Sequence, residues 1–91
     1  MIAGVLGAAL AGMESRAEPP PPVTGNAYDQ GLPQLPASWA EAITRFETSP
    51  HVADCFAPGL IRNLVQTKRQ ELRYMAELGP EERLELYLDT V

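Results

Sequence analysis

Few side chains in this 91-residue sequence have the type and spacing that chemistry requires. His51 and Cys55 are four residues apart and could share a helical face as metal ligands, but two ligands make a poor site because zinc takes three or four from the protein. We therefore expect Cys55 to be a small core residue. Lys68 is predicted to lie within an apolar stripe, where its ammonium needs either water or a carboxylate. No acid, base or phosphate-binding residues cluster around Lys68 in the sequence, which favours a structural role over a catalytic one.

Composition and charge exclude several classes of function. The formal net charge is -5 and the pI is near 4.7, which argues against a nucleic-acid binder and against binding to acidic membrane surfaces. The 45% hydrophobic content is typical of globular proteins. A single cysteine cannot form an intrachain disulfide, so a reducing cytoplasm is the expected location.

Residues 1–15 are predicted to form a buried apolar helix. The uncharged run is too short to span a bilayer, and it lacks the basic residues of a secretory signal although Ala9-Leu10-Ala11 resembles a cleavage site. Small residues on one side would allow another backbone to approach closely, and larger ones form a stripe on the other. The three glycines weaken the helix, so it should depend on neighbours. The small residues are Gly4, Gly7, Ala8 and Ala11, and the stripe contains Ile2, Val5, Leu6, Leu10 and Met13.

Residues 16–37 are predicted to form an extended, proline-rich strap. The segment holds six of the nine prolines, including four in a row from Pro19 to Pro22, so no helix can cross it. Pro33 and Pro36 have the PxxP spacing that SH3-like grooves bind. We favour instead a strap that lies against its own domain.

Residues 38–91 are predicted to be helical, which makes the fold class of this chain all-α. Ser38 and Glu41 form a capping box for a helix that ends near Thr48. Ser49-Pro50 begins a short helix, and a long one is expected from Pro58 to Leu78, where Gly79-Pro80 ends it. The last helix has an apolar stripe that reaches the end of the chain: Leu84, Tyr87, Leu88 and Val91. This stripe could fold back on the long helix, because residues 60–76 carry excess positive charge and residues 77–91 carry excess negative charge, so the two segments attract each other. Alternatively, it could dock into another subunit.

Taken in order along the whole chain, these segments resemble the carboxy-terminal end of the glutamine synthetase family. The similarity is nearest to the branch that includes gamma-glutamylpolyamine synthetases. It is carried by the apolar segment 2–14, the four prolines, Gly25-Asn26-Ala27-Tyr28, Leu35-Pro36 with Trp39 and Ala42, Lys68-Arg69-Gln70-Glu71, and Tyr87-Leu88 before Val91.

The resemblance implies an ATP-dependent ligase that activates the gamma-carboxylate of glutamate as an acyl phosphate for attack by ammonia or an amine. The family binds ATP and Mg²⁺ or Mn²⁺ through residues that lie upstream of this segment. We therefore expect no catalytic, cofactor-binding or metal-binding residue here, and no ligase activity from this chain alone. The expected partners are the remainder of the catalytic domain and further copies in a double ring. Lys68, Arg69 and Glu71 are expected to be structural.

Two further features of the family correspond to residues of this chain. Tyr28 resembles a loop tyrosine that some bacterial members adenylylate, but Gln30-Gly31 departs from that loop, so a ring packed on the strap is favoured. The last helix resembles the carboxy-terminal thong that inserts into a subunit of the opposite ring. This makes four residues the expected oligomer contacts: Leu84, Tyr87, Leu88 and Val91. Leu64 and Glu82 stand where the family often has tyrosine and tryptophan.

The alternative to a segment of a ligase is an independent small helical protein that binds a partner through exposed apolar faces. The DNA upstream of the Met1 codon would discriminate, because an in-frame catalytic region would identify a truncated, split or excised part of a ligase. The sequence does not distinguish ammonia from a polyamine as the amine substrate.

Overall fold

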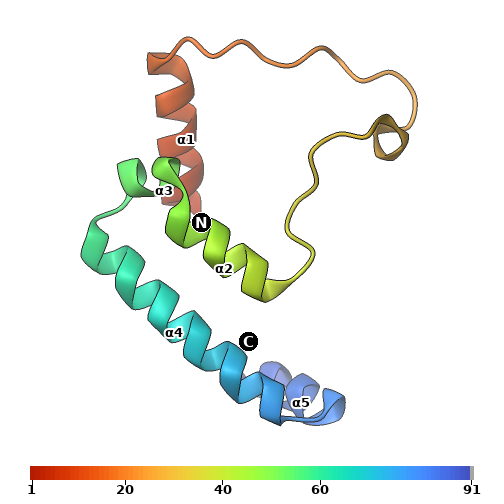
Figure 1. Ribbon diagram of the computed structural model, residues 1–91, viewed down its shortest axis with the longest axis vertical. Coiled ribbons are helices and arrows are strands. Elements are labelled where there is room, and N and C mark those ends of the chain that lie inside the picture. The colour runs from red at the N-terminus through yellow and green to blue at the C-terminus, as the bar shows by residue number, and fades with distance from the viewer. Residues whose placement is uncertain (91) are drawn as a thin grey trace.

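The computed structural model describes residues 1–90, and within them the chain is helical without a strand (Figure 1). This confirms the all-α fold class. Along the chain the elements are α1 (Ile2–Glu14), a 3-10 helix η1 (Ala27–Gln30), α2 (Trp39–Thr48), α3 (Pro50–Cys55), α4 (Pro58–Glu77) and α5 (Pro80–Thr90). Val91 lies outside the described residues, so its expected role as an oligomer contact is not placed.

The helix boundaries follow from local capping. The Ser38 hydroxyl accepts a hydrogen bond from the Glu41 amide at 3.2 Å, as the capping box predicts. The Ser49 hydroxyl caps α3 by accepting from the Val52 amide at 3.4 Å. After α4, the Gly79 amide donates to the Glu82 carboxylate at 2.8 Å and thereby satisfies a free amide at the start of α5.

The strap is extended, as predicted, but it does not lie against the helices of this chain. It runs out from α1, turns at η1 and returns to α2 at a distance from the helical body (Figure 1), and every residue from 17 to 35 is exposed. A proline-rich segment has no internal backbone hydrogen bonds, and within residues 1–90 no other element covers residues 17–35.

The core is small and is centred on the contact between α2 and α4. Three hydrophobic residues are buried among those described: Ile43, Val65 and Met75. The radius of gyration is 17.0 Å, against about 12 Å for a compact domain of this length. The accessible surface is 7953 Å², whereas a compact monomer of this mass would expose roughly 5,200 Å². The helices therefore leave much of their apolar surface uncovered.

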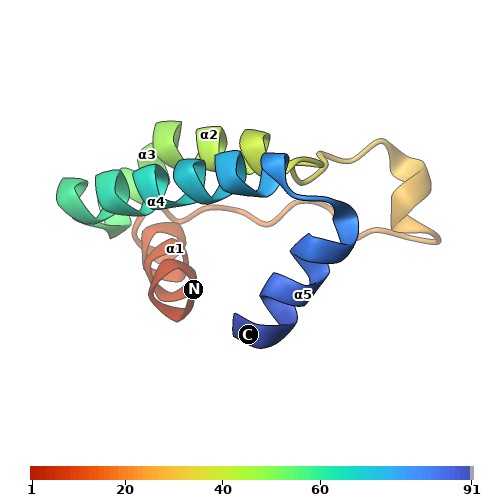
Figure 2. The same cartoon turned by 90° about the horizontal axis from the view of Figure 1, so that it is seen from below.

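Two helices project from the same side of the central layer. Figure 2 shows α2, α3 and α4 in one layer, with α1 and α5 extending below it and their free ends turned toward each other. The packing partner of α1 is α3. This contact uses the small-residue face predicted for residues 1–15: an added Cβ on Gly4 would meet the Phe56 ring at 3.6 Å, and one on Gly7 would lie 3.2 Å from Cys55 Cβ.

The burial that we expected for α1 is not supplied by this chain. No residue of α1 is buried, because α3 covers only its glycine face. The opposite stripe, at 53–76% exposure, is open to solvent: Ile2, Val5, Leu6, Leu10 and Met13.

We expect Gly7→Val to detach α1 from α3. The new Cβ would lie 3.2 Å from Cys55 Cβ and closer still to its Sγ, so the Cys55 side chain or the two helices would have to shift, and the two valine methyl groups would add to the crowding. Gly12→Val is the matched control, because a Cβ there meets nothing within 4 Å while the change in helix propensity is the same. Amide exchange of residues 2–13 should become faster in Gly7→Val than in Gly12→Val. Equal exchange in the two variants would contradict this account.

Candidate assembly site

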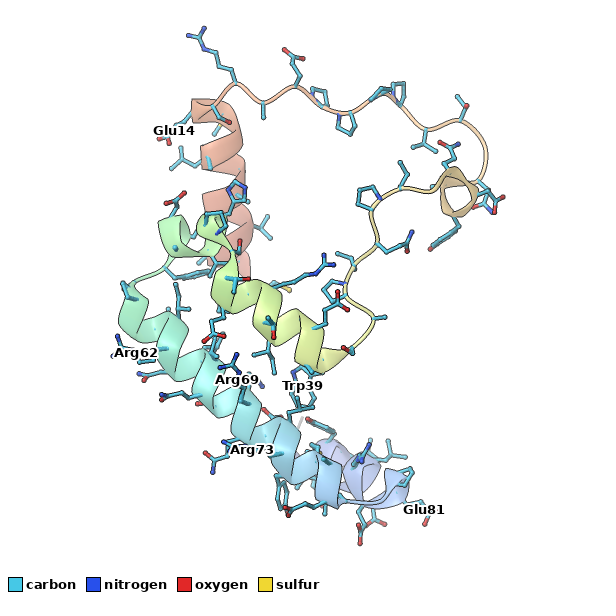
Figure 3. All side chains as sticks on the ribbon, viewed as in Figure 1. Glu14, Trp39, Arg62, Arg69, Arg73 and Glu81 are labelled. Carbon is cyan, nitrogen blue, oxygen red and sulfur yellow. The ribbon has the colours of Figure 1, made fainter. Side chains whose placement is uncertain are left out.

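Four side chains from three helices meet where α5 joins the rest of the chain. Lys68 and Glu71 lie one turn apart on α4, and the Lys68 ammonium is 2.8 Å from one carboxylate oxygen of Glu71. The same ammonium lies 5.9 Å from the ring centroid of Trp39 at the start of α2, a cation-π distance. Trp39 projects from α2 toward α4 in Figure 3. The charge of Lys68 is thus met by a carboxylate and an aromatic face within its apolar stripe.

The fourth residue is Tyr87 of α5. Its hydroxyl donates to the other carboxylate oxygen of Glu71 at 2.9 Å, so Glu71 accepts from a cation on one side and from a phenol on the other. Tyr87 also lines an apolar groove of about 390 Å³ with residues of α2, α4 and α5: Trp39, Leu72, Met75, Ala76 and Arg83. The sequence pattern places Glu71 and Tyr87 in separate helices and does not predict their contact, because no periodic signal relates residues sixteen apart across a helix break.

These contacts shift the pKa values of Glu71 and Tyr87 in opposite directions. The hydrogen bond from Lys68, followed by that from Tyr87, lowers the pKa of Glu71. Desolvation, followed by the hydrogen bond to Glu71, raises the pKa of Tyr87. Both shifts favour the pairing of an ionised carboxylate with a neutral phenol.

We predict a pH window for the attachment of α5. A carboxylate with a lowered pKa stabilises the folded arrangement fully above its unfolded value of about 4.3 and loses this contribution as pH falls through the folded value. A phenol with a raised pKa contributes fully below about 10 and loses its contribution as pH rises through the folded value. Ring resonances of Tyr87 should therefore change below about pH 4.3 and above about pH 10. A Tyr87 environment that is constant down to pH 2 would contradict this prediction.

Arg69 connects the same two helices at another point. Both of its terminal nitrogens donate to the Glu47 carboxylate of α2, one of them at 3.3 Å. Both side chains are nearly half exposed, and exposed pairs contribute about 0 to 1 kcal/mol. Arg62 and Arg73 point away from α4 on its outer side (Figure 3).

The apolar stripe of α5 divides between two directions. Tyr87 is half-buried toward α4, whereas Leu84 is 61% exposed and Leu88 is 72% exposed. Among residues 1–90 no ion pair joins α4 to α5. The contrast in charge between 60–76 and 77–91 therefore does not fold the two leucines back onto the long helix.

A family model described as the catalytic domain of glutamine synthetase matches residues 1–87. The chain belongs to the glutamine synthetase family. This confirms the resemblance to the carboxy-terminal segment of the family, whereas the polyamine branch remains a prediction. No curated protein and no solved structure matches this chain.

The remaining candidate residues of this glutamine synthetase-family segment lie apart from the cluster formed by Trp39, Lys68, Glu71 and Tyr87. Cys55 faces Gly7 of α1, and His51 lines an open cavity of about 650 Å³ between α1 and α3. Within residues 1–90 no three His, Cys, Asp or Glu side chains gather as a metal site would require. Tyr28 is 87% exposed on η1, so its ring does not pack on the strap. The Asn26 side chain caps η1 through the Tyr28 amide, and the phenol is left in solvent.

Across the part of this glutamine synthetase-family chain that the structure describes, we find no helix with the length and apolarity that crossing a membrane requires.

Proposed function

We propose that this chain is the carboxy-terminal helical part of a glutamine synthetase-type, ATP-dependent ligase that joins the gamma-carboxylate of glutamate to ammonia or an amine. Its contribution is structure and subunit assembly. We assign the binding of ATP and of Mg²⁺ or Mn²⁺ to the rest of the catalytic domain, as the family resemblance implies. We assign the ligase to the cytoplasm and to the branch that includes gamma-glutamylpolyamine synthetases, on the resemblance of its sequence pattern.

The uncovered apolar surface carries this proposal. The chain exposes roughly 2,700 Å² more surface than a compact monomer of its mass, whereas a standard protein interface buries about 800 Å² on each partner. The excess includes the stripes of α1 and α5, which extend from one side of the central layer (Figure 2). We assign the α1 stripe to the remainder of the catalytic domain and Leu84 and Leu88 of α5 to a neighbouring subunit.

The independent interaction module is the weaker candidate. A protein that acts alone needs a stable core of its own, and the three buried hydrophobic residues among residues 1–90 supply a marginal one. The low compactness of the described residues favours a segment whose core is completed by the remainder of the catalytic domain.

Complementation tests the proposal. A glutamine synthetase-type catalytic region that lacks the corresponding carboxy-terminal segment is mixed with this chain, and both assembly by sedimentation and glutamate-dependent ADP release are measured. The chain should restore both, whereas the chain alone should show neither ligase activity nor saturable binding of ATP with Mg²⁺ in calorimetry. Full assembly and activity of the truncated region without the chain, or saturable ATP binding by the chain alone, would contradict the proposal.

A further inference from the structure

The attachment of α5 depends on very few contacts. Among residues 1–90, the hydrogen bond from Tyr87 to Glu71 is the one side-chain hydrogen bond between α5 and another helix, and no ion pair is added to it. The other polar contacts of α5 are local, such as Arg83 donating to the Leu78 carbonyl at 3.0 Å. The rest of the contact is the apolar groove beside Trp39.

Glu71 is itself held in place from the other side. Lys68 binds one of its oxygens at 2.8 Å, which keeps the carboxylate ionised and directs the second oxygen toward Tyr87. Lys68 in turn lies against the Trp39 ring. The chain of contacts therefore runs from α2 through α4 to α5, and each member limits the freedom of the next.

From this geometry we propose that Glu71 is a positioning residue: by holding Tyr87 it sets the angle between α5 and α4, and with it the direction in which Leu84 and Leu88 face. With eleven residues, α5 is about 16 Å long. A swing of about 20° at the Leu78-Gly79 link would therefore move its far end by about 5 Å, as far as one helical turn. The consequence for assembly rests on the proposed function, whereas the angle itself does not.

The test measures the angle directly in the full chain. Spin labels are attached to cysteines that replace Gln66 on α4 and Asp89 on α5, both exposed, in a Cys55→Ala background, and the distribution of label distances is recorded by pulsed electron paramagnetic resonance. The parent should give one narrow distribution. Tyr87→Phe and Glu71→Ala should each broaden it at least twofold while helix content by circular dichroism stays unchanged, which separates positioning from folding.

Matched controls are available on the same helix. Tyr74 is 52% exposed and Glu77 is exposed. Neither side chain takes part in the hydrogen bond between Tyr87 and Glu71 that joins α5 to α4. Tyr74→Phe and Glu77→Ala should therefore keep the narrow distribution. A narrow distribution in Tyr87→Phe, a broad one in the parent, or equal broadening in the controls would overturn the inference.

The result of the spin-label test can be distinguished from the result of the assembly test. If Tyr87→Phe broadens the distribution while the removal of Leu84 and Leu88 leaves assembly unchanged, Glu71 is a positioning residue and the assembly proposal is wrong. If the distribution stays narrow while assembly depends on the two leucines, the assembly proposal stands and the role of Glu71 is overturned.

Discussion

Replacing both Leu84 and Leu88 with serine in an assembled glutamine synthetase-type enzyme that carries this segment is expected to release smaller species while each subunit stays folded. The two side chains are 61% and 72% exposed within the chain, so their loss costs the subunit little. If they are buried in a neighbouring subunit, each contributes about 1.5 to 3 kcal/mol. The loss of both side chains would then lower the affinity of each interface roughly 10²-fold to 10⁴-fold.

Sedimentation velocity measures this effect directly. Leu32→Ser with Leu35→Ser is the control, since it removes two leucines from the exposed strap and should leave the assembly intact. The prediction is wrong if the Leu84 and Leu88 variant keeps its assembly state until it melts and melts earlier than the parent. That result would place the stripe in the subunit's own core.

The second large effect is expected from Ile43→Ala. Ile43 is 7% exposed and lies between α2 and α4, in contact with the same cavity as Val65 and Trp39. Truncation of a buried isoleucine costs about 2 to 5 kcal/mol, which is comparable with the total stability that a core of this size supplies. We therefore expect α2 to separate from α4 and most of the chain to lose its helical signal at 25 °C.

Leu88→Ala provides the comparison, because it removes the same number of carbon atoms from a side chain that is 72% exposed and should change stability by no more than about 0.5 kcal/mol. Urea unfolding followed by circular dichroism gives the midpoints. Equal midpoints for the two variants would show that the contact between α2 and α4 is not the core of the fold.

The sequence by itself determined the helices and the family. Helix ends depend on residues within a few positions of each other, such as Ser38 with Glu41, and on prolines that cannot continue a helix. The structure accordingly begins α2, α3 and α4 at the predicted residues and ends α4 at Glu77, one residue before the predicted Leu78. The spacing of Trp39, Ile43 and Phe46 places all three on one helical face, and in the structure they line the cavity between α2 and α4, because periodicity identifies which side of a helix must be covered.

The tertiary structure alone decided what covers each face and where the outer helices point. An apolar stripe requires burial, but its spacing does not specify a partner, so the sequence predicted a buried α1 while the structure leaves its large side chains exposed. The apolar stripe of α5 is likewise divided in the structure: Tyr87 lines the groove beside Trp39 and donates a hydrogen bond to Glu71, whereas Leu84 is open to solvent. Such a bond joins residues distant in the chain and depends on the helix crossing angle, a quantity that no local pattern of residue types contains.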